Sequence, residues 1–320
     1  METPQQEVTE TVRPIEVEIL GESFSTKVNL SDEQVLANGH SKKAEEAKSE
    51  SNDESPPKEA LPLYKAKEHD SQFNPSDYLE GFYSTAKEDG AMQMVLFFLP
   101  GILYRLPNKV IDLLDLGAGP TVYIPIAVRH RAENIYTSDY AKQNREKLIE
   151  WIKNQSNFDW KNVCNWIANI EVRGENPAQM QQIAREKMRA VFKVNVHQDE
   201  VIQGVEYVTK PEFRENIPKY FDAVITVFCL EYASETWEEY RKAVKGATSL
   251  IKPGGYLIQG GVMEAKEYSF GNKRFKCHYL TKEQILESLE ENSMSTDDSN
   301  GTFRLITNWG VFLLFSKKSN

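Results

Sequence analysis

Short apolar runs alternate with segments of helical spacing from about residue 110 to residue 260. Near-continuous apolar runs are typical of strands buried on both faces of a parallel sheet. Segments with apolar residues three and four positions apart predict helices packed on that sheet. The predicted strands are 110–116, 134–139, 192–196, 221–230 and 256–260. The predicted helices among them are 121–131, 141–153 and 235–250, after an earlier buried helix over 89–106.

The end of the chain has a different pattern. A helix is predicted over 281–291, and two apolar runs, 303–307 and 311–316, follow it. Asn308, Trp309 and Gly310 separate these runs, which indicates a β-hairpin. Five β/α units and a terminal antiparallel pair predict an α/β, Rossmann-like fold. We expect a mostly parallel seven-stranded sheet with helices on both faces and one reversed edge strand.

The first sixty residues lack this pattern. They are dominated by Ser, Glu, Lys and Asn and end at Pro56-Pro57. Such a composition buries too little apolar surface to offset the entropy of ordering. We therefore predict a disordered tail over 1–62 and one domain over 63–320. Near the start of that domain, Asn74 precedes Pro75 as a helix cap within a segment rich in aromatic residues. That segment fits either a core-facing helix or a lid over a ligand.

Charge and cysteine content narrow the classes of function. The formal net charge is −10, which argues against a nucleic-acid partner. The three cysteines are far apart, so neither a disulfide framework nor a metal site is predicted, and a reducing compartment is expected. The N-terminus has no apolar signal region, and no run reaches the length of a membrane span. These features predict a cytoplasmic protein, and nothing indicates an obligate assembly.

A glycine turn follows the first predicted strand. Asp115 ends the apolar run, and Gly117 and Gly119 let backbone amides approach a ligand closely. Asp139 follows Gly119 by 20 residues, a spacing that fits a carboxylate on ribose hydroxyls. A dinucleotide site, as in an NAD-dependent oxidoreductase, would carry a third glycine where Val122 stands. An S-adenosylmethionine site fits better, because Asp115 suits a cationic ligand and would repel a pyrophosphate.

The turn sequence Asp-Leu-Gly-Ala-Gly-Pro-Thr-Val-Tyr over 115–123 resembles the first motif of class I methyltransferases. More narrowly, the chain resembles the family of nicotinamide, indolethylamine and phenylethanolamine N-methyltransferases over about 68–318. The matching pieces are 73–80, 119–123, 137–140, 143–144, 158–160, 228–231, 250–255 and 271–275. The resemblance implies a class I methyltransferase fold, S-adenosylmethionine as cofactor and direct methyl displacement onto nitrogen.

The resemblance also implies a cofactor site. It places Tyr78 and Tyr83 in a lid, Asp139 on the ribose and Tyr140 against the adenine. Asn195 stands where the family usually has aspartate, and its amide still offers an acceptor to the adenine amino group. The full set of implied cofactor residues is Tyr78, Tyr83, Gly117, Ala118, Thr121, Tyr123, Asp139, Tyr140, Asn144, Asn195 and Val196.

The resemblance implies Tyr78, Glu231 and Tyr268 as the catalytic set. Tyr268 matches an aromatic position that stacks on substrate, and Glu231 matches a carboxylate that faces an amine. Positions with polar substrate contacts in the nicotinamide branch read Gly261, Ala265 and Cys277 here. The small-molecule acceptor therefore stays open between a pyridine such as nicotinamide and an alkyl amine. Other functions left open are a non-catalytic binding protein of methyltransferase fold and an NAD-dependent oxidoreductase.

Overall fold

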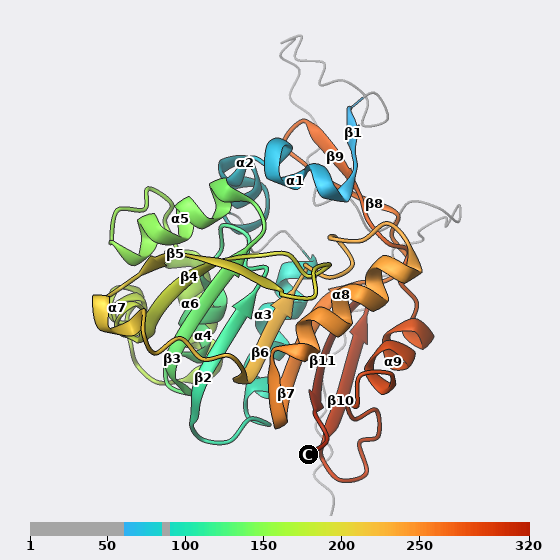
Figure 1. The fold of residues 1–320 in the computed structure, drawn as a ribbon. Coiled ribbons are helices and arrows are strands. Elements are labelled where there is room, and N and C mark those ends of the chain that lie inside the picture. The colour runs from blue at the N-terminus through green and yellow to red at the C-terminus, as the bar shows by residue number, and fades with distance from the viewer. Residues whose placement is uncertain (1–60, 85–89) are drawn as a thin grey trace, which may run out of the picture. The chain divides into compact units, whose positions relative to one another are not determined.

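The computed structural model describes residues 61–84 and 90–320. Most of the predicted disordered tail, residues 1–60, lies outside this described part of the chain. The described chain forms an eight-stranded sheet of order β10-β11-β7-β6-β2-β3-β4-β5, with helices on both faces (Figure 1). Its strands are β2 (Val110–Leu116), β3 (Ala132–Asp139), β4 (Met188–Val194), β5 (Ile202–Val208), β6 (Phe221–Val227), β7 (Ile251–Val262), β10 (Phe303–Asn308) and β11 (Val311–Lys317).

Two apolar clusters hold the helices on the two faces of the sheet. One cluster contains residues of α3, α4, α5, α6 and α7, and the other contains residues of α8 and α9. The bounds are α3 (Gly90–Leu103), α4 (Tyr123–Val128), α5 (Lys142–Ile152), α6 (Lys161–Glu171), α7 (Pro177–Lys187), α8 (Trp237–Ser249) and α9 (Lys282–Glu290). No helix in the described part of the chain is both long and apolar enough to cross a membrane.

The strand pairing confirms the predicted α/β architecture. Strand β2 pairs in parallel with β3 and β6, β3 pairs with β4, and β6 pairs with β7. The terminal hairpin is also confirmed, and its turn uses the left-handed conformation at Trp309 (φ 47°) and Gly310 (φ 73°). Positive φ angles at both turn residues match the right-handed twist of the two strands, and this two-residue turn fixes the hairpin register.

Two details of the predicted sheet are wrong. The reversed strand β11 is not an edge strand, because it lies between β7 and β10. The sheet also has an eighth strand, β5, which pairs antiparallel with β4 at the opposite edge. Strand β5 is only half-buried and carries Gly204, so it lacks the apolar run of a central strand.

Two predicted boundaries also move. Strand β4 starts directly after α7, four residues before the predicted 192–196. Strand β7 begins at Ile251, five residues before the predicted 256–260, and so contains Pro253-Gly254-Gly255. The pairing register between β6 and β7 shifts at this segment, and Gly254 takes φ +72°. The segment is a bulge in the strand, which is where strands accommodate proline.

A smaller assembly, which we call the cap, lies beyond the carboxyl ends of β2, β3 and β6 (Figure 1). It joins residues 61–84 to the hairpin β8–β9 through a three-stranded sheet of order β1-β9-β8. Its elements are β1 (Leu63–Tyr64), the 3-10 turn Ala66–Glu68, α1 (His69–Gln72), α2 (Pro75–Leu79), the wide turn Glu80–Ser84, β8 (Glu267–Phe270) and β9 (Lys273–Lys276). The predicted Asn74 cap is confirmed, because its side chain accepts hydrogen bonds from the Ser76 and Asp77 amides.

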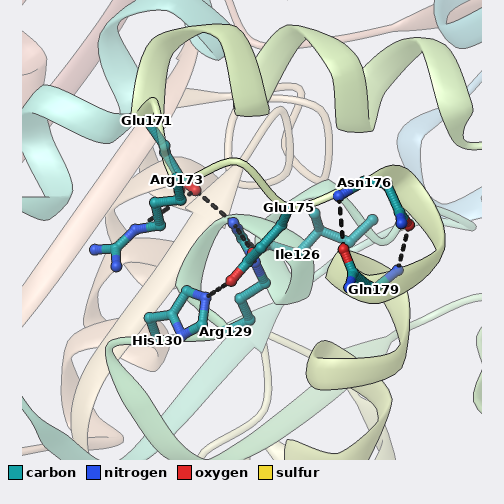
Figure 2. Close-up of polar contacts among 8 residues, drawn as sticks. All are labelled: Ile126, Arg129, His130, Glu171, Arg173, Glu175, Asn176 and Gln179. Atoms are coloured by element: carbon teal, nitrogen blue, oxygen red, sulfur yellow. Dashed lines mark hydrogen bonds and ion pairs between the residues drawn. The ribbon is translucent and has the colours of Figure 1, made fainter.

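A buried ion-pair cluster joins α4 to the loop between α6 and α7 (Figure 2). The Arg129 side chain is 1% exposed. It donates to Glu175 at 2.8 Å, to Glu171 at 2.5 Å and to the Ile126 carbonyl at 2.7 Å. His130 contacts the second oxygen of Glu175 at 2.6 Å. The short helix α4 is thus fixed at its C-terminal end by charge as well as by apolar packing.

Candidate active site

A cavity opens at the carboxyl ends of β2, β3, β4 and β6, beneath the cap. In a parallel sheet the loops after these strands meet at one edge, which is where ligands bind in such folds. The cavity is lined by every expected cofactor residue, from Tyr78 to Val196, and by Tyr268. Glu231 alone among the expected site residues is not on the cavity wall.

The glycine turn after β2 brings two loops into close contact. Gly117 has φ +70°, and a Cβ there would lie 2.1 Å from the Sγ of Cys229, in the loop after β6. Gly119 has φ +61° and open space around it. Glycine at 117 therefore serves the contact between loops, whereas glycine at 119 provides the positive φ of the turn and leaves space beside it at the cavity.

Asp139 organises the turn from the end of β3. Its carboxylate accepts hydrogen bonds from the Gly119 amide at 2.8 Å, the Ala141 amide at 2.8 Å and the Asn144 side chain at 3.0 Å. Burial raises the pKa of Asp139, and these hydrogen bonds act in the opposite direction. The Oδ1 of Asn144 is buried and has no hydrogen-bond partner among the described residues. Asp139 and Asn144 together present acceptors suited to hydroxyl groups.

Asp115 is a buried carboxylate at the end of β2. Burial, and then the charge of Asp139, raise its pKa well above the ordinary range. Its Oδ2 has no hydrogen-bond partner among the described residues, although the residue lines the cavity. A buried carboxylate with an oxygen that lacks a hydrogen-bond partner favours a cationic ligand, which would supply both the positive charge and the hydrogen bonds.

Tyrosines from the cap and from α4 form another wall. The Tyr83 ring stacks on Tyr123 at a centroid distance of 5.8 Å, and Tyr78 lies 5.9 Å from Tyr83. Tyr83 and Tyr123 are buried, whereas Tyr78 is partly exposed. These rings join the cap to the glycine turn and exclude water from that end of the cavity.

The opposite end of the cavity is more open. Tyr140 is 37% exposed, and Asn195 and Val196 follow β4. The Oδ1 of Asn195 accepts a hydrogen bond from the His197 amide at 3.0 Å. The acceptor that we expected for an adenine amino group is therefore already used once within its own turn, although a carbonyl oxygen has a second lone pair.

The wall near Tyr268 contains two residues that the sequence did not single out. The Tyr232 ring stacks on the Tyr268 ring with centroids 3.9 Å apart, and His69 lies 2.5 Å from the Tyr268 hydroxyl. Burial lowers the pKa of His69 to about 4, so its ring is neutral at pH 7. Tyr232 directly follows the matched segment 228–231, and His69 precedes the segment 73–80, so proximity to those motifs was the available signal.

Glu231 lies behind this wall and is fully buried. Its Oε1 accepts a hydrogen bond from the Val262 amide at 3.1 Å, and its Oε2 has no partner among the described residues. Burial raises its pKa to about 8. A Cβ at Gly261 would lie 2.4 Å from Oε1, so the carboxylate occupies the space that a side chain at 261 would need.

Comparison with known proteins decides between the cofactors. The model of the NNMT/PNMT/TEMT family matches residues 61–319. The chain belongs to this family. It is 57% identical over 251 residues to the nicotinamide N-methyltransferase of Caenorhabditis elegans, covering 78% of this chain and 91% of that protein. Identity to the human nicotinamide N-methyltransferase is 26% over 258 residues, covering 78% and 94%. Identity to the rabbit (Oryctolagus cuniculus) indolethylamine N-methyltransferase is 29% over 227 residues, covering 69% and 82%.

The chain is thus an S-adenosylmethionine-dependent N-methyltransferase that acts on a small molecule. The cavity of this N-methyltransferase fits that cofactor. Asp115 presents an unpaired buried oxygen that suits an ammonium group, and Asp139 with Asn144 presents acceptors that suit a ribose. The glycine turn lines the cavity between Asp115 and Asp139, next to the space that the cofactor would occupy.

Proposed function

We propose that this N-methyltransferase methylates the ring nitrogen of a small pyridine, with nicotinamide as the first candidate. The observation that carries the proposal is the 57% identity to a nicotinamide N-methyltransferase over 91% of that protein's length. A pyridine nitrogen is neutral at pH 7 and has a free lone pair, so the site has to align it and exclude water. The buried rings of Tyr83, Tyr123 and Tyr268 support both tasks.

We assign the cofactor residues as follows. Asp115 binds the ammonium group, and the turn of Gly117, Ala118 and Thr121, with Tyr123, surrounds the methionine end. Asp139 and Asn144 bind the ribose diol, and Tyr140, Asn195 and Val196 surround the adenine. When bound, the cofactor supplies a methyl group on a positively charged sulfur, which a nitrogen lone pair can take. Tyr78 and Tyr83 cover this reaction from the cap.

A primary or secondary amine is the second candidate, and Glu231 favours it. The nicotinamide branch is expected to have a polar contact at position 261, where this chain has glycine. The Glu231 carboxylate extends into that space, within 2.4 Å of where a Cβ would stand. An ammonium substrate must lose a proton before it can attack. From behind the cavity wall, the ionised form of Glu231, which becomes populated as the pH passes about 8, would position that substrate through a bridging water.

The test is a methyl-transfer assay with purified protein and methyl-labelled S-adenosylmethionine. The acceptors are nicotinamide, a second pyridine and two aryl-alkyl amines, and Glu231→Gln is run beside the wild type. Transfer to nicotinamide that survives Glu231→Gln supports the pyridine proposal. Transfer confined to the amines and lost in Glu231→Gln would replace it with the amine candidate. Cofactor binding without transfer to any acceptor would contradict both.

The cellular location, the oligomeric state and the partners of the enzyme also belong to this proposal. Three free cysteines and a net charge of −10 support a cytoplasmic monomer with no nucleic-acid partner. Size-exclusion chromatography with light scattering tests the monomer, and a mass of twice 36.7 kDa would contradict it.

A further inference from the structure

Tyr232 and Tyr268 form an unusually close pair of rings in the cavity wall. Their centroids lie 3.9 Å apart and their planes differ by 6°. Aromatic side chains prefer offset or edge-to-face arrangements with centroids about 4.5–7 Å apart over a face-to-face sandwich. The Tyr232 ring therefore covers one face of Tyr268 directly, in a geometry that gains little from ring quadrupoles.

The Tyr268 ring is fixed by its other neighbours. It is 6% exposed and lies 5.5 Å from Phe275 and 6.0 Å from Phe270. Neutral His69 contacts the Ala66 carbonyl through Nδ1, so this nitrogen carries the proton. Its Nε2 is then the acceptor for the Tyr268 hydroxyl at 2.5 Å. Tyr268 is thus tethered to the cap by packing and by a hydrogen bond.

Tyr232 is held less firmly. It is partly exposed and lies in the turn between β6 and α8, with Phe228 as its other ring neighbour at 6.2 Å. That turn begins at Phe228, which has φ 54°, and continues through Cys229, whose Sγ touches the glycine turn. Tyr232 therefore lies where the cofactor end of the cavity meets the cap. An entering ring can reach the face of Tyr268 that Tyr232 covers only by displacing Tyr232, which is the more exposed of the two stacked rings.

We propose that Tyr232 is a gate of the acceptor site, whose ring covers Tyr268 in the free enzyme and swings away when an aromatic acceptor takes its place. The inference rests on the proposed function, because it concerns the acceptor of that reaction. A pyridine that gains a methyl group becomes a cation, and phenol faces attract cations. Tyr268 would thereby bind the product ring better than it binds Tyr232. The gate also sets specificity, because acceptors must fit the space that Tyr232 leaves.

The activity test compares wild type, Tyr232→Phe and Tyr232→Ala with nicotinamide and with isoquinoline, a bicyclic pyridine. Phenylalanine keeps the gate ring, whereas alanine removes it. The ratio of kcat/KM for isoquinoline to that for nicotinamide should rise about tenfold in Tyr232→Ala, the scale of one ring contact, and stay at the wild-type value in Tyr232→Phe. The Kd for S-adenosylhomocysteine should stay within about twofold in all three, as expected for a change outside the cofactor contacts. An equal ratio in all three proteins, with cofactor binding and nicotinamide transfer intact, would overturn the gate and leave the proposed function standing.

A second readout does not depend on turnover. Tyrosine ring carbons are labelled with carbon-13, and the Tyr232 signal is assigned by its loss in Tyr232→Phe. With S-adenosylhomocysteine bound, addition of nicotinamide should move this signal toward that of an unstacked tyrosine. A shift at Tyr268 while Tyr232 stays unchanged would overturn the gate alone. No shift at any tyrosine, together with no transfer to any acceptor, would overturn the proposed function and the gate with it.

Discussion

Two regions of the molecule bury charge in opposite ways. Around Arg129, two carboxylates, a carbonyl and the guanidinium satisfy one another (Figure 2). At the cavity, Asp115 on the wall and Glu231 behind it each keep a buried oxygen without a partner among the described residues. An unpaired carboxylate that is buried destabilises a fold, and removing one partner of a buried ion pair destabilises it for the same reason. The Arg129 cluster therefore serves stability, and the cavity gives up stability for the ability to bind.

The pKa shifts follow the same division. Burial alone would raise the pKa of Glu175, but hydrogen bonds from Arg129 and His130 hold it below its ordinary value. Burial raises the pKa of Asp115, and it raises the pKa of Glu231 by more than the backbone hydrogen bonds to that carboxylate lower it. A carboxyl with a lowered pKa stabilises the fold above its unfolded pKa, and one with a raised pKa stabilises it below. The two regions thus respond to pH with opposite signs.

The largest expected effect is on stability and comes from Arg129→Met. Methionine fills similar space but leaves Glu171 and Glu175 without their cation. The free energy of unfolding should fall by about 3 kcal/mol, as when one partner of a buried pair is lost. Urea denaturation measures this, and calorimetry with S-adenosylhomocysteine should give an unchanged Kd. A Kd that weakens in step with stability would show that the two regions are not separate.

Whereas Arg129→Met should lower stability and leave binding unchanged, Asp139→Ala should weaken cofactor binding. It removes the proposed ribose ligand, and loss of two hydrogen bonds to a charged acceptor should raise the Kd for S-adenosylhomocysteine about 100-fold. Asp298→Ala, which removes a carboxylate that pairs with Arg105 and Arg304 away from the cavity, is the matched control. Calorimetry measures both, and equal affinities in the two variants would contradict the assignment of Asp139.

Glu231→Gln tests the sign of the pH dependence. The folded pKa of about 8 exceeds the ordinary 4.5, so the contribution of Glu231 to stability is fully present below pH 4.5 and is lost as the pH rises toward 8. The unfolding free energy of the ligand-free wild type should therefore carry a downward slope from this group, up to about 1.4 kcal/mol per pH unit. Denaturation between pH 5 and pH 8 should show a shallower fall in the variant. Parallel curves would contradict the raised pKa.

The smallest expected effect comes from His130→Ala. Its ring is 32% exposed at the rim of the Arg129 cluster, and partly exposed pairs contribute about 0–1 kcal/mol. The loss of unfolding free energy at pH 7 should stay within that range. A loss as large as that of Arg129→Met would mean that the rim, and not the buried guanidinium, fixes the end of α4.

The sequence predicted those parts of the fold that local pattern determines. Strand β2 matches its apolar run residue for residue, and the Asn74 cap and the terminal hairpin follow from local turn chemistry. Strand β5 could not be predicted in this way, because its half-buried residues carry no clear period and its place depends on pairing with β4. Long-range pairing also decides that β11 lies inside the sheet.

The site shows the same limit. All the predicted site residues except Glu231 lie on the cavity wall, because loops after parallel strands must meet at one edge. The motifs did not predict that the Asn195 carbonyl oxygen is used within its own turn, or that Tyr232 covers Tyr268. The Asn195 contact is a local turn in which the side-chain oxygen accepts from the amide two residues on. The contact between Tyr232 and Tyr268 joins side chains from different segments of the chain, so spacing along the chain carries no signal for it.

The small sheet of the cap has a consequence for synthesis. Leu63 pairs with Arg274, and Tyr64 with Phe275, so almost the whole domain is translated between the two halves of that sheet. At about 5–20 residues per second, the first half waits on the order of tens of seconds for its partner. The strands that carry Asp115 and Asp139 leave the ribosome well before the hairpin β8–β9. The cap sheet can therefore form only after β9 has been translated, so closure of the cap over the cavity is a late step of folding.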